Sequence, residues 1–506
     1  MIAADVSTSE GRAVASSALV TAAAQITIMA ISGVLGLLIL LKFGKNARTD
    51  GLFAAYGVYG FLTLLAQSLR TTVVPRLVEG DSLYANVDRF FGALLLIFAL
   101  SAIPLVALGD PLASLLTGDL GASAHDAAQT ALAILWLSAG AQFIAALSAA
   151  ALGVHDDFGF IAIAYVLGGA ASIAGLFLLA GPLGIDAVAT GAAAGSALTA
   201  ALLLWRLVRR GYRPALGAMR EGAGARATHE PIFGGSAGYM IFYLTLVISL
   251  AFAARIDEGD VTLYSYAFFA ALAVMSISSG PAGLVLAAPL SQTWDRTLAS
   301  LEPHLLAVFR TGVVVILPVI AVAVLLGDEL VDLILGTKLT AADADTLVGT
   351  FAALSGMLVT SIASIVPLIA AFTLSRYLRV ALISAACIGL HVGLSAIALE
   401  IGTLQALAGA TSVSLLVWLC LLLALDYGAG LIAPLALFSR ELLRVALVAA
   451  LAFVPLGLIA ISIGGAAVEV VAAIAGLALF VLLTHRALPA HWELVMRLVK
   501  PLTRAA

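Results

Sequence analysis

Residues 206–231, RLVRRGYRPALGAMREGAGARATHEP, form the longest basic stretch of this chain and separate two long apolar regions. Before this stretch lie six apolar runs that are each about long enough to cross a bilayer, and after it lie eight more. A segment inside lipid must satisfy its backbone hydrogen bonds internally, so each run is predicted to be a helix. The sequence therefore predicts an all-α polytopic membrane protein with about fourteen transmembrane helices.

The composition supports this fold class. Hydrophobic residues make up 62% of the chain and charged residues 11%, against roughly 45–50% and 25% in soluble domains. The predicted helices are 15–41, 51–73, 88–108, 126–152, 158–180, 184–207, 232–254, 261–288, 303–326, 342–374, 377–399, 402–424, 441–462 and 464–485. The segments 126–152 and 342–374 are long enough to contain turns outside the lipid.

Several kinds of chemistry have no support in the sequence. Cys387 and Cys420 lie inside apolar runs, and no Cys/His cluster has the spacing of metal ligands. There is no phosphate-binding glycine loop, and no catalytic constellation lies at a common depth, so we expect neither an enzyme nor a cofactor. The net charge of −4 gives no reason to expect a nucleic-acid partner.

The basic residues predict the orientation. An even number of spans puts both termini on one side, and most Lys and Arg residues fall in the gaps on that side. The opposite gaps hold only Lys42, Lys45, Arg48, Arg255 and Lys338. Because basic loops stay in the cytoplasm, both termini are predicted to be cytoplasmic.

The two sides of the basic stretch are weakly alike, which suggests an internal repeat. One span opens with Thr49-Asp50 and closes with Val74-Pro75-Arg76-Leu77, and another opens with Val261-Thr262 and closes with Ala288-Pro289-Leu290-Ser291. Repeated halves around a midplane site are a common transporter plan. The predicted domains are an N-lobe at 1–207, a cytoplasmic basic linker at 208–231, a C-lobe at 232–425, and an added helix pair with an amphipathic tail at 426–506.

These motifs resemble a known family. Gly33-Val34-Leu35-Gly36, Phe43-Gly44, Thr49-Asp50-Gly51-Leu52-Phe53 and Val74-Pro75-Arg76-Leu77 are similar to the first two helices of MurJ/MviN-like lipid II flippases. Val261 to Ala267, Gly280-Pro281-Ala282-Gly283 and Ala288 to Ser291 resemble the matching eighth helix. The family belongs to the multidrug/oligosaccharidyl-lipid/polysaccharide (MOP) exporter superfamily. The resemblance implies alternating access between two helical lobes and a polyprenyl-linked sugar as substrate, with its lipid tail beside the last two helices.

The chain also departs from that family. The first helix carries Gly33 and Ile39 where relatives carry arginines, and Phe61 and Leu62 replace a basic pair. Phe268 follows Tyr266-Ala267 where arginine is common. Arginines are natural partners of a pyrophosphate, so their absence favours a divergent member of the family that handles another polyprenyl-linked glycan or glycolipid over one that handles lipid II itself.

The second span carries a polar stripe. Tyr56, Tyr59, Thr63, Gln67 and Arg70 all fall within about 60° of one another on a helix of 100° per residue. One interpretation is a substrate-binding cavity wall, with Arg70 as the partner of an anionic headgroup. The other is hydrogen bonding between helices, with Arg70 extending to the membrane surface.

Two further groups are candidates for substrate contact and gating. Arg255 and Tyr243 lie on the seventh span, and a charge near a span marks a candidate site. Asp50, Arg48 and Asp257 lie at the predicted outer ends and are candidate gate residues, Asp50 also as a helix cap. The alternatives are an interfacial ion pair between Arg255 and Asp257 and an ordinary solvated loop around Arg48.

His391 lies midway along the eleventh span, without a second histidine nearby. It is a candidate proton relay, because histidine titrates near neutral pH. The alternative is a buried histidine bonded to a neighbouring helix. H⁺ and Na⁺ are the candidate coupling ions.

The sequence thus predicts a flippase that translocates a polyprenyl-linked envelope glycan precursor across the bacterial cytoplasmic membrane, with membrane lipids as further partners. A cation-coupled antiporter of the MATE type is one alternative. A non-transporting membrane scaffold for envelope synthesis is the other, since buried charge is scarce.

Overall fold

The structure is a computed structural model that describes residues 31, 34–73, 77, 82–155, 157–224, 226–278, 298–335, 338–374, 376–494 and 496. These residues form helices and turns and contain no strand. Eleven helical segments among the described residues are long and apolar enough to cross a membrane. The predicted spans 15–41 and 261–288 lie partly outside the described residues, as do several side chains of 232–254. The chain divides into two compact units, Met1–Thr262 and Leu263–Ala506.

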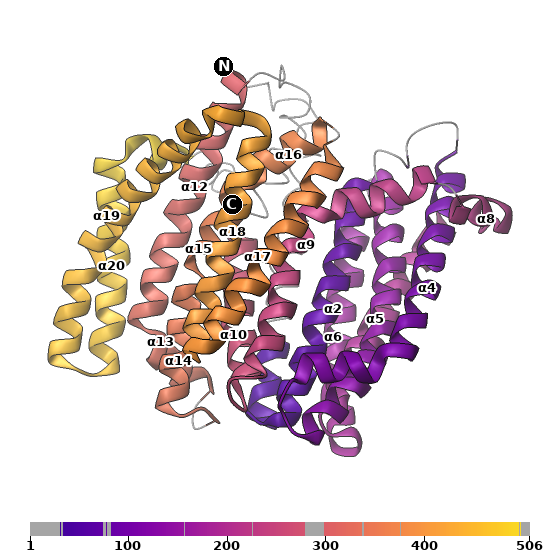
Figure 1. Cartoon of the computed structure of the whole chain (residues 1–506), viewed down its shortest axis with the longest axis horizontal. Coiled ribbons are helices and arrows are strands. Elements are labelled where there is room, and N and C mark those ends of the chain that lie inside the picture. The colour runs from indigo at the N-terminus through magenta and orange to yellow at the C-terminus, as the bar shows by residue number, and fades with distance from the viewer. Residues whose placement is uncertain are drawn as a thin grey trace. The chain divides into compact units, whose positions relative to one another are not determined.

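The first unit is a helical bundle in which α2 packs against α5 and α9, α6 against α7, α5 against α7, and α4 against α8 (Figure 1). Its helices are α2 (Ala47–Thr72), α4 (Leu83–Thr117), α5 (Ala122–Val154), α6 (Phe158–Leu183), α7 (Asp186–Arg209), α8 (Leu216–Gly224) and α9 (Arg226–Ala253). The next helix, α10 (Asp260–Ser278), begins in this unit and continues in the second.

Glycine permits the closest helix contacts of the first unit. A Cβ added to Gly175 of α6 would lie 2.8 Å from the Cα of Gly191 on α7. At Gly51 of α2 it would lie 2.0 Å from the carbonyl oxygen of Ala124 on α5. Because apolar side chains gain little by leaving lipid for another apolar surface, such backbone approach is a main source of helix association in membranes.

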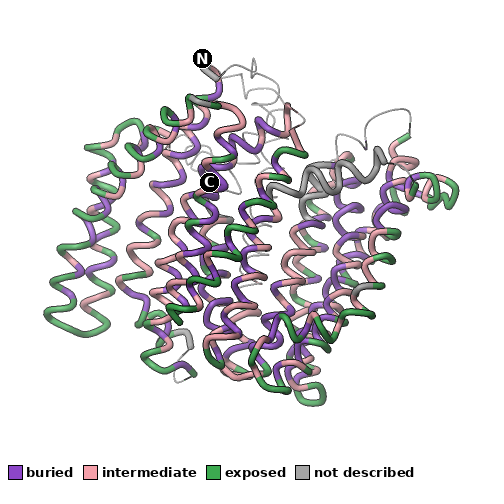
Figure 2. Tube along the Cα trace, in the orientation of Figure 1, coloured by how far each residue is buried: buried purple, intermediate pink, exposed green. Residues whose placement is uncertain are grey.

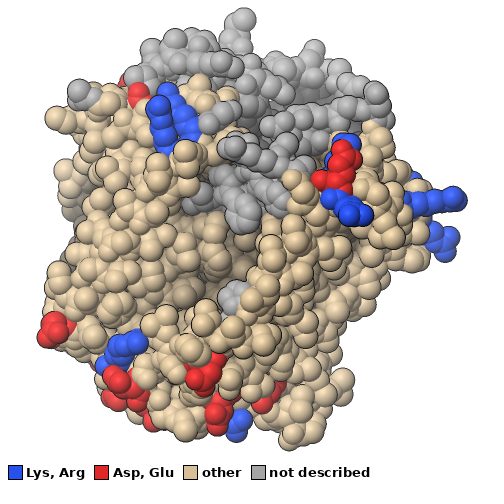
Figure 3. All heavy atoms as spheres, turned by 45° about the vertical axis from the view of Figure 1, so that its right-hand side comes forward, with Lys and Arg blue, Asp and Glu red and all other residues tan. Residues whose placement is uncertain are grey.

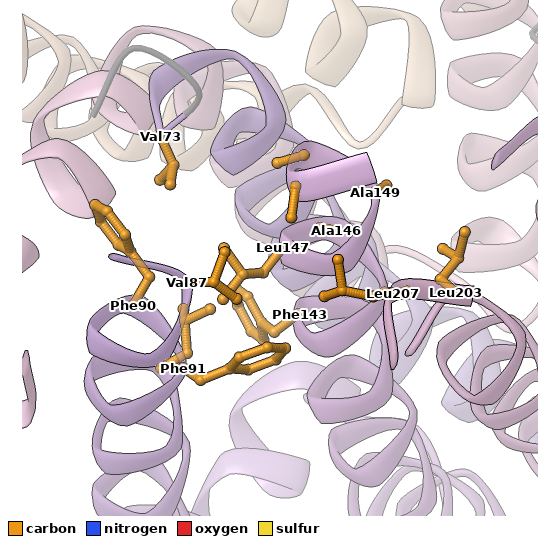
Figure 4. Close-up of a cluster of buried hydrophobic side chains, with 14 of the residues drawn as sticks. Val73, Val87, Phe90, Phe91, Phe143, Ala146, Leu147, Ala149, Leu203 and Leu207 are labelled. Atoms are coloured by element: carbon orange, nitrogen blue, oxygen red, sulfur yellow. The ribbon is translucent and has the colours of Figure 1, made fainter. Parts of the chain in front are cut away.

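A cluster of larger apolar side chains lies at one end of this unit. Val87 and Phe91 of α4 meet Phe143 and Leu147 of α5, with Leu207 of α7 beside them (Figure 4). All five are buried. The cluster fixes the ends of these helices close to the basic stretch that follows α7.

The second unit centres on α18, which packs against α15 and α17, while α12 packs against α19, and α19 against α20. Its helices are α12 (Leu298–Leu325), α13 (Gly327–Leu335), α14 (Ala341–Ala353), α15 (Ser355–Ala363), α16 (Ile365–Thr373), α17 (Tyr377–Ile401), α18 (Leu404–Tyr427), a 3₁₀ turn (Gly428–Leu431), α19 (Ile432–Ile463) and α20 (Ala466–Ala487).

One face of α19 exposes large apolar side chains. The exposed residues of this helix are green in Figure 2. The large apolar side chains follow one another three or four residues apart: Leu443, Leu447, Leu451, Val454, Leu458 and Ile461. A soluble helix would turn such a stripe inward, so this face suits contact with lipid.

The observed helices begin or end at other residues than the predicted apolar spans. The run 88–108 is only part of α4, whose start is capped by Ser82 Oγ accepting the N–H of Ala85 at 3.3 Å. The predicted span 342–374 is three consecutive helices, α14 to α16. Apolar runs mark the length that lies in lipid, whereas caps and glycines determine where the helix itself begins and ends.

Candidate functional site

Asp50, in the first turn of α2, is fully buried. Its Oδ2 accepts the backbone N–H of Gly259 at 2.5 Å, and its Oδ1 accepts both the N–H of Thr262 at 2.9 Å and the Thr262 hydroxyl at 2.6 Å. These donors lie at the start of α10, where backbone N–H groups have no partner within the helix and the helix dipole favours negative charge. Asp50 therefore caps α10 from another helix.

The surrounding turn is held by further contacts from the start of α2. The N–H of Ala47 donates to Glu258 Oε1 at 3.0 Å. Gly259 has φ +93° and lies against the side chain of Lys45, so both its backbone conformation and the space around it favour glycine. The sequence motifs predicted Asp50 but not Gly259 as part of this site. Thr262, which donates to Asp50, belongs to the motif Val261-Thr262, but nothing in the sequence indicated this role.

The two other predicted gate residues are exposed. Arg48 projects from α2, and Asp257 Oδ1 accepts the N–H of Glu258 at 2.8 Å in the turn before α10. The carboxylate of Asp50 accepts hydrogen bonds from Gly259 and Thr262 rather than from these two residues. A gate role for Arg48 and Asp257 stays a prediction.

Arg255 follows α9 and binds backbone carbonyls. Its guanidinium donates to the carbonyl oxygen of Ala251 and, at 3.2 Å, to that of Leu115. The C-terminal carbonyls of a helix lack partners and attract cations. Arg255 thus joins the ends of α9 and α4, and its predicted contact with substrate stays a prediction.

Tyr59 of the predicted stripe lies in a polar cluster between α2, α5 and α7. Its hydroxyl is 3.0 Å from Ser138 Oγ and 3.2 Å from Ser196 Oγ, while Gln142 donates to Ser196 Oγ at 2.9 Å. The two serine hydroxyls are 2.8 Å apart. This arrangement corresponds to the alternative interpretation, hydrogen bonding between helices, for this one member of the stripe. Nothing in the sequence distinguished Ser138 and Ser196 from other small polar residues.

The other described members lie beside it. The ring of Tyr56 is 5.5 Å from that of Tyr59, and Thr63 donates to the carbonyl of Gly60 at 2.9 Å. A Cβ on Gly60 would lie 2.5 Å from the ring of Tyr243, so α9 brings Tyr243 directly onto α2. Tyr56, Thr63 and Tyr243 are half-buried. The side chains of Gln67 and Arg70 lie outside the described residues.

His391 in the second unit is fully buried between α17 and α18. Its Nδ1 is 3.2 Å from Ser414 Oγ, and its Nε2 is 3.4 Å from Ser395 Oγ. Since Ser414 gives its own hydrogen to the carbonyl of Ala410 at 2.7 Å, it accepts one from Nδ1. The arrangement therefore places a proton on Nδ1. A proton-relay role stays a prediction.

A buried acid that the sequence did not predict lies on α19. Glu441 is 2% exposed, and its Oε1 accepts from Arg310 of α12 and from Arg444, each at 3.1 Å. His491, which follows α20, is also 2% exposed, with its Nε2 3.2 Å from Glu441 Oε2. The group joins α12, α19 and the segment after α20. Glu441 is at the predicted cytoplasmic end of the span 441–462, where acidic residues are common. The sequence therefore did not indicate that this side chain is buried.

This group predicts a loss of stability in acid. Burial lowers the pKa of His491 below its usual 6.5, an effect that Glu441 opposes and that Arg310 and Arg444 reinforce. The folded protein then binds this proton more weakly than the unfolded chain does, so stability falls as the pH drops below 6.5. We expect the melting temperature in detergent to fall by a few degrees more in the wild type than in His491→Gln between about pH 7.5 and about pH 5. Equal pH dependence in both proteins would contradict the assignment.

The described part of the chain holds no group of three or more His, Cys, Asp or Glu side chains that could bind a metal ion.

Comparisons with known proteins identify the relatives of this chain. A family model described as "Lipid II flippase MurJ" matches residues 41–476. No curated protein matches the sequence. Among solved structures, the chain is similar to a lipid II flippase MurJ in an inward closed conformation, with a TM-score of 0.74 and 15% identity over 92% of this chain and 98% of that one.

Two other solved structures are similar at a lower level. An inward-facing MATE-family multidrug resistance transporter of the MOP superfamily gives a TM-score of 0.61 and 14% identity, over 84% of this chain and 98% of that one. A MOP-superfamily transporter from Pyrococcus furiosus gives 0.59 and 14%, over 84% and 96%. At such identities the likeness shows the fold alone.

Proposed function

Because this chain belongs to the MurJ lipid II flippase family, we propose that it moves a polyprenyl-linked glycan precursor of the cell envelope across the bacterial cytoplasmic membrane by alternating access. The match of the family model over residues 41–476 carries this proposal. The MATE-type antiporter shares the fold, so the fold does not separate the two functions. The family match favours the flippase over both the antiporter and the scaffold.

The substrate is lipid II or a related lipid-linked sugar. These candidate substrates share a pyrophosphate group. We assign the headgroup to the polar stripe that the helical period predicts for α2, which includes Tyr56, Thr63, Gln67 and Arg70. Arg70 supplies the cation, because a guanidinium can donate two parallel hydrogen bonds to a phosphate. Tyr59 has a different role: its contacts with Ser138 and Ser196 position α2 against α5 and α7.

Arg70→Ala tests both the function and the site. A lost hydrogen bond to a charged group weakens binding by about 1.5–3 kcal/mol, which is roughly 10–100-fold. We expect the wild type to co-purify with a defined polyprenyl glycolipid in native mass spectrometry, and Arg70→Ala to retain at least about ten-fold less of it. Arg379→Ala, an exposed arginine of α17, is the matched control and should retain the wild-type amount.

The outcomes separate the two parts of the proposal. If the wild type carries no prenyl lipid, and added lipid II or another polyprenyl-linked sugar does not bind either, the flippase assignment fails. If Arg70→Ala retains as much as the wild type, the flippase assignment stands and Arg70 is not the headgroup partner.

A further inference from the structure

The basic stretch after α7 is fixed to the first unit rather than free of it. Asp88 of α4 is 1% exposed and accepts the Tyr212 hydroxyl at 2.6 Å and the N–H of Ala215 at 3.1 Å. Helix α8 then lies directly on α4: a Cβ on Gly92 would be 1.8 Å from the carbonyl oxygen of Met219, and one on Gly222 would be 2.1 Å from that of Arg89. A stretch held in this way presents its remaining side chains on a defined surface.

Acidic side chains of this region already have partners. Asp157, before α6, binds Arg206 at 2.7 Å and Arg210 at 3.0 Å, and Glu221 of α8 binds Arg89 at 3.3 Å. Burial raises the pKa of Asp157, but the two arginines outweigh burial and lower it below the usual value, so the carboxylate is charged at neutral pH. Asp88 is occupied by Tyr212 and Ala215.

Three arginines of the basic stretch remain among the side chains that the structure describes. Arg209, Arg213 and Arg220 are exposed, and none has an acidic partner among the described residues. We call them the seam arginines. On the face drawn in Figure 3, some basic side chains adjoin acidic ones, whereas others project alone at the right of the view.

One of the seam arginines lies at the end of a candidate membrane span. Arg209 is the last residue of α7, a helix long and apolar enough to span a membrane. Its guanidinium carbon lies 5.5 Å from the ring centre of Trp205, which is 50% exposed. Tryptophan at a helix end is typical of the layer of lipid headgroups. In α8, Leu216 is 81% exposed and gives the same surface an apolar contact for lipid.

We propose that the seam arginines, with Trp205 and Leu216, form a binding surface for the headgroups of anionic phospholipids. Phosphate diesters are the one abundant anion at this depth, and unpaired guanidinium groups bind them well. The surface fixes α8, and with it the beginning of α9, to the lipid layer. It is separate from the polar face of α2 and does not depend on which substrate the protein moves.

The test removes the three charges together. Arg209→Gln, Arg213→Gln and Arg220→Gln are combined in one variant, and Arg379→Gln, Arg440→Gln and Arg486→Gln, three exposed arginines of the second unit, form a control with the same net charge. The probes are phosphatidylglycerol and phosphatidylcholine added to the purified full chain, with bound lipid counted by native mass spectrometry. Each basic residue near a lipid surface contributes about five-fold in binding.

We expect the seam variant to bind phosphatidylglycerol at least about ten-fold more weakly than the wild type and the control. Replacing the same three arginines by lysine should restore most of the binding, because the charge remains. An unchanged melting temperature in phosphatidylcholine shows that the seam variant is folded.

Three results would overturn the proposal. Wild-type binding in a folded seam variant would show that these arginines do not hold the lipid. An equal loss in the control would show that net charge alone, rather than a defined surface, attracts the lipid. Binding of an acidic protein with no preference among lipids would assign the surface to another kind of partner.

Discussion

Replacement of Asp50 by alanine is expected to reduce the free energy of unfolding by roughly 3 kcal/mol or more and to abolish transport. The side chain is fully buried and accepts three hydrogen bonds from Gly259 and Thr262. Alanine would leave these donors without a partner at the beginning of α10. A buried donor that loses its acceptor costs about 1–3 kcal/mol, and a lost helix cap about 1 kcal/mol. The unfolding midpoint of the purified protein measures this effect, and flipping of a labelled lipid in vesicles measures the functional one.

Two matched variants separate capping from charge. Asp50→Asn keeps an acceptor for Thr262 and should lose about half as much stability as the alanine variant. Asp257→Ala removes the same side chain from an exposed position in the neighbouring turn, where surface substitutions change stability by about 0.5 kcal/mol or less. A melting temperature of Asp50→Ala equal to that of Asp257→Ala would refute the capping assignment.

The second large effect is expected at Gly51. A methyl group at this position would lie 2.0 Å from the carbonyl oxygen of Ala124, and the obstacle is backbone rather than a side chain that can turn away. Overpacking of this kind costs about 1–3 kcal/mol and sometimes more, because α2 and α5 must move apart along their contact. We expect Gly51→Ala to lower both the yield of folded protein and its melting temperature by several degrees.

Gly393→Ala is the control for Gly51→Ala. Gly393 lies within α17, and a Cβ there would meet nothing within 4 Å. Alanine is favoured over glycine inside a helix by about 0.5–1 kcal/mol, so this variant should be as stable as the wild type or slightly more stable. A loss at Gly393 as large as that at Gly51 would mean that close packing at Gly51 does not govern the effect.

The fold class and the family could be predicted from the sequence. Apolar runs of membrane length predicted helices, and the described residues form helices without strands. The motifs around Thr49-Asp50 and Val261-Thr262 predicted a MurJ/MviN-like protein, and the family match confirms that prediction. Both inferences succeed because they depend on local composition and short motifs, which one chain displays directly.

The candidate site could be predicted only in part. The period of a helix placed Tyr56, Tyr59 and Thr63 on one face of α2, yet it could not show which neighbour each side chain would meet. Tyr59 bonds to Ser138 and Ser196, which are 79 and 137 residues away along the chain. No local pattern encodes such a pairing, because it depends on which helices lie side by side in the folded protein.

The sequence by itself determined that this chain is a helical membrane protein of the MurJ family, since hydrophobic length and motif spacing are properties of contiguous residues. Only the tertiary structure decided what the polar residues do. It buried Asp50 against the start of α10, and it paired Arg206 and Arg210 with Asp157, leaving Arg209 exposed. The physical reason is that a polar or charged group in an apolar bundle is stable only beside a partner, and packing between distant helices determines which partner is within reach.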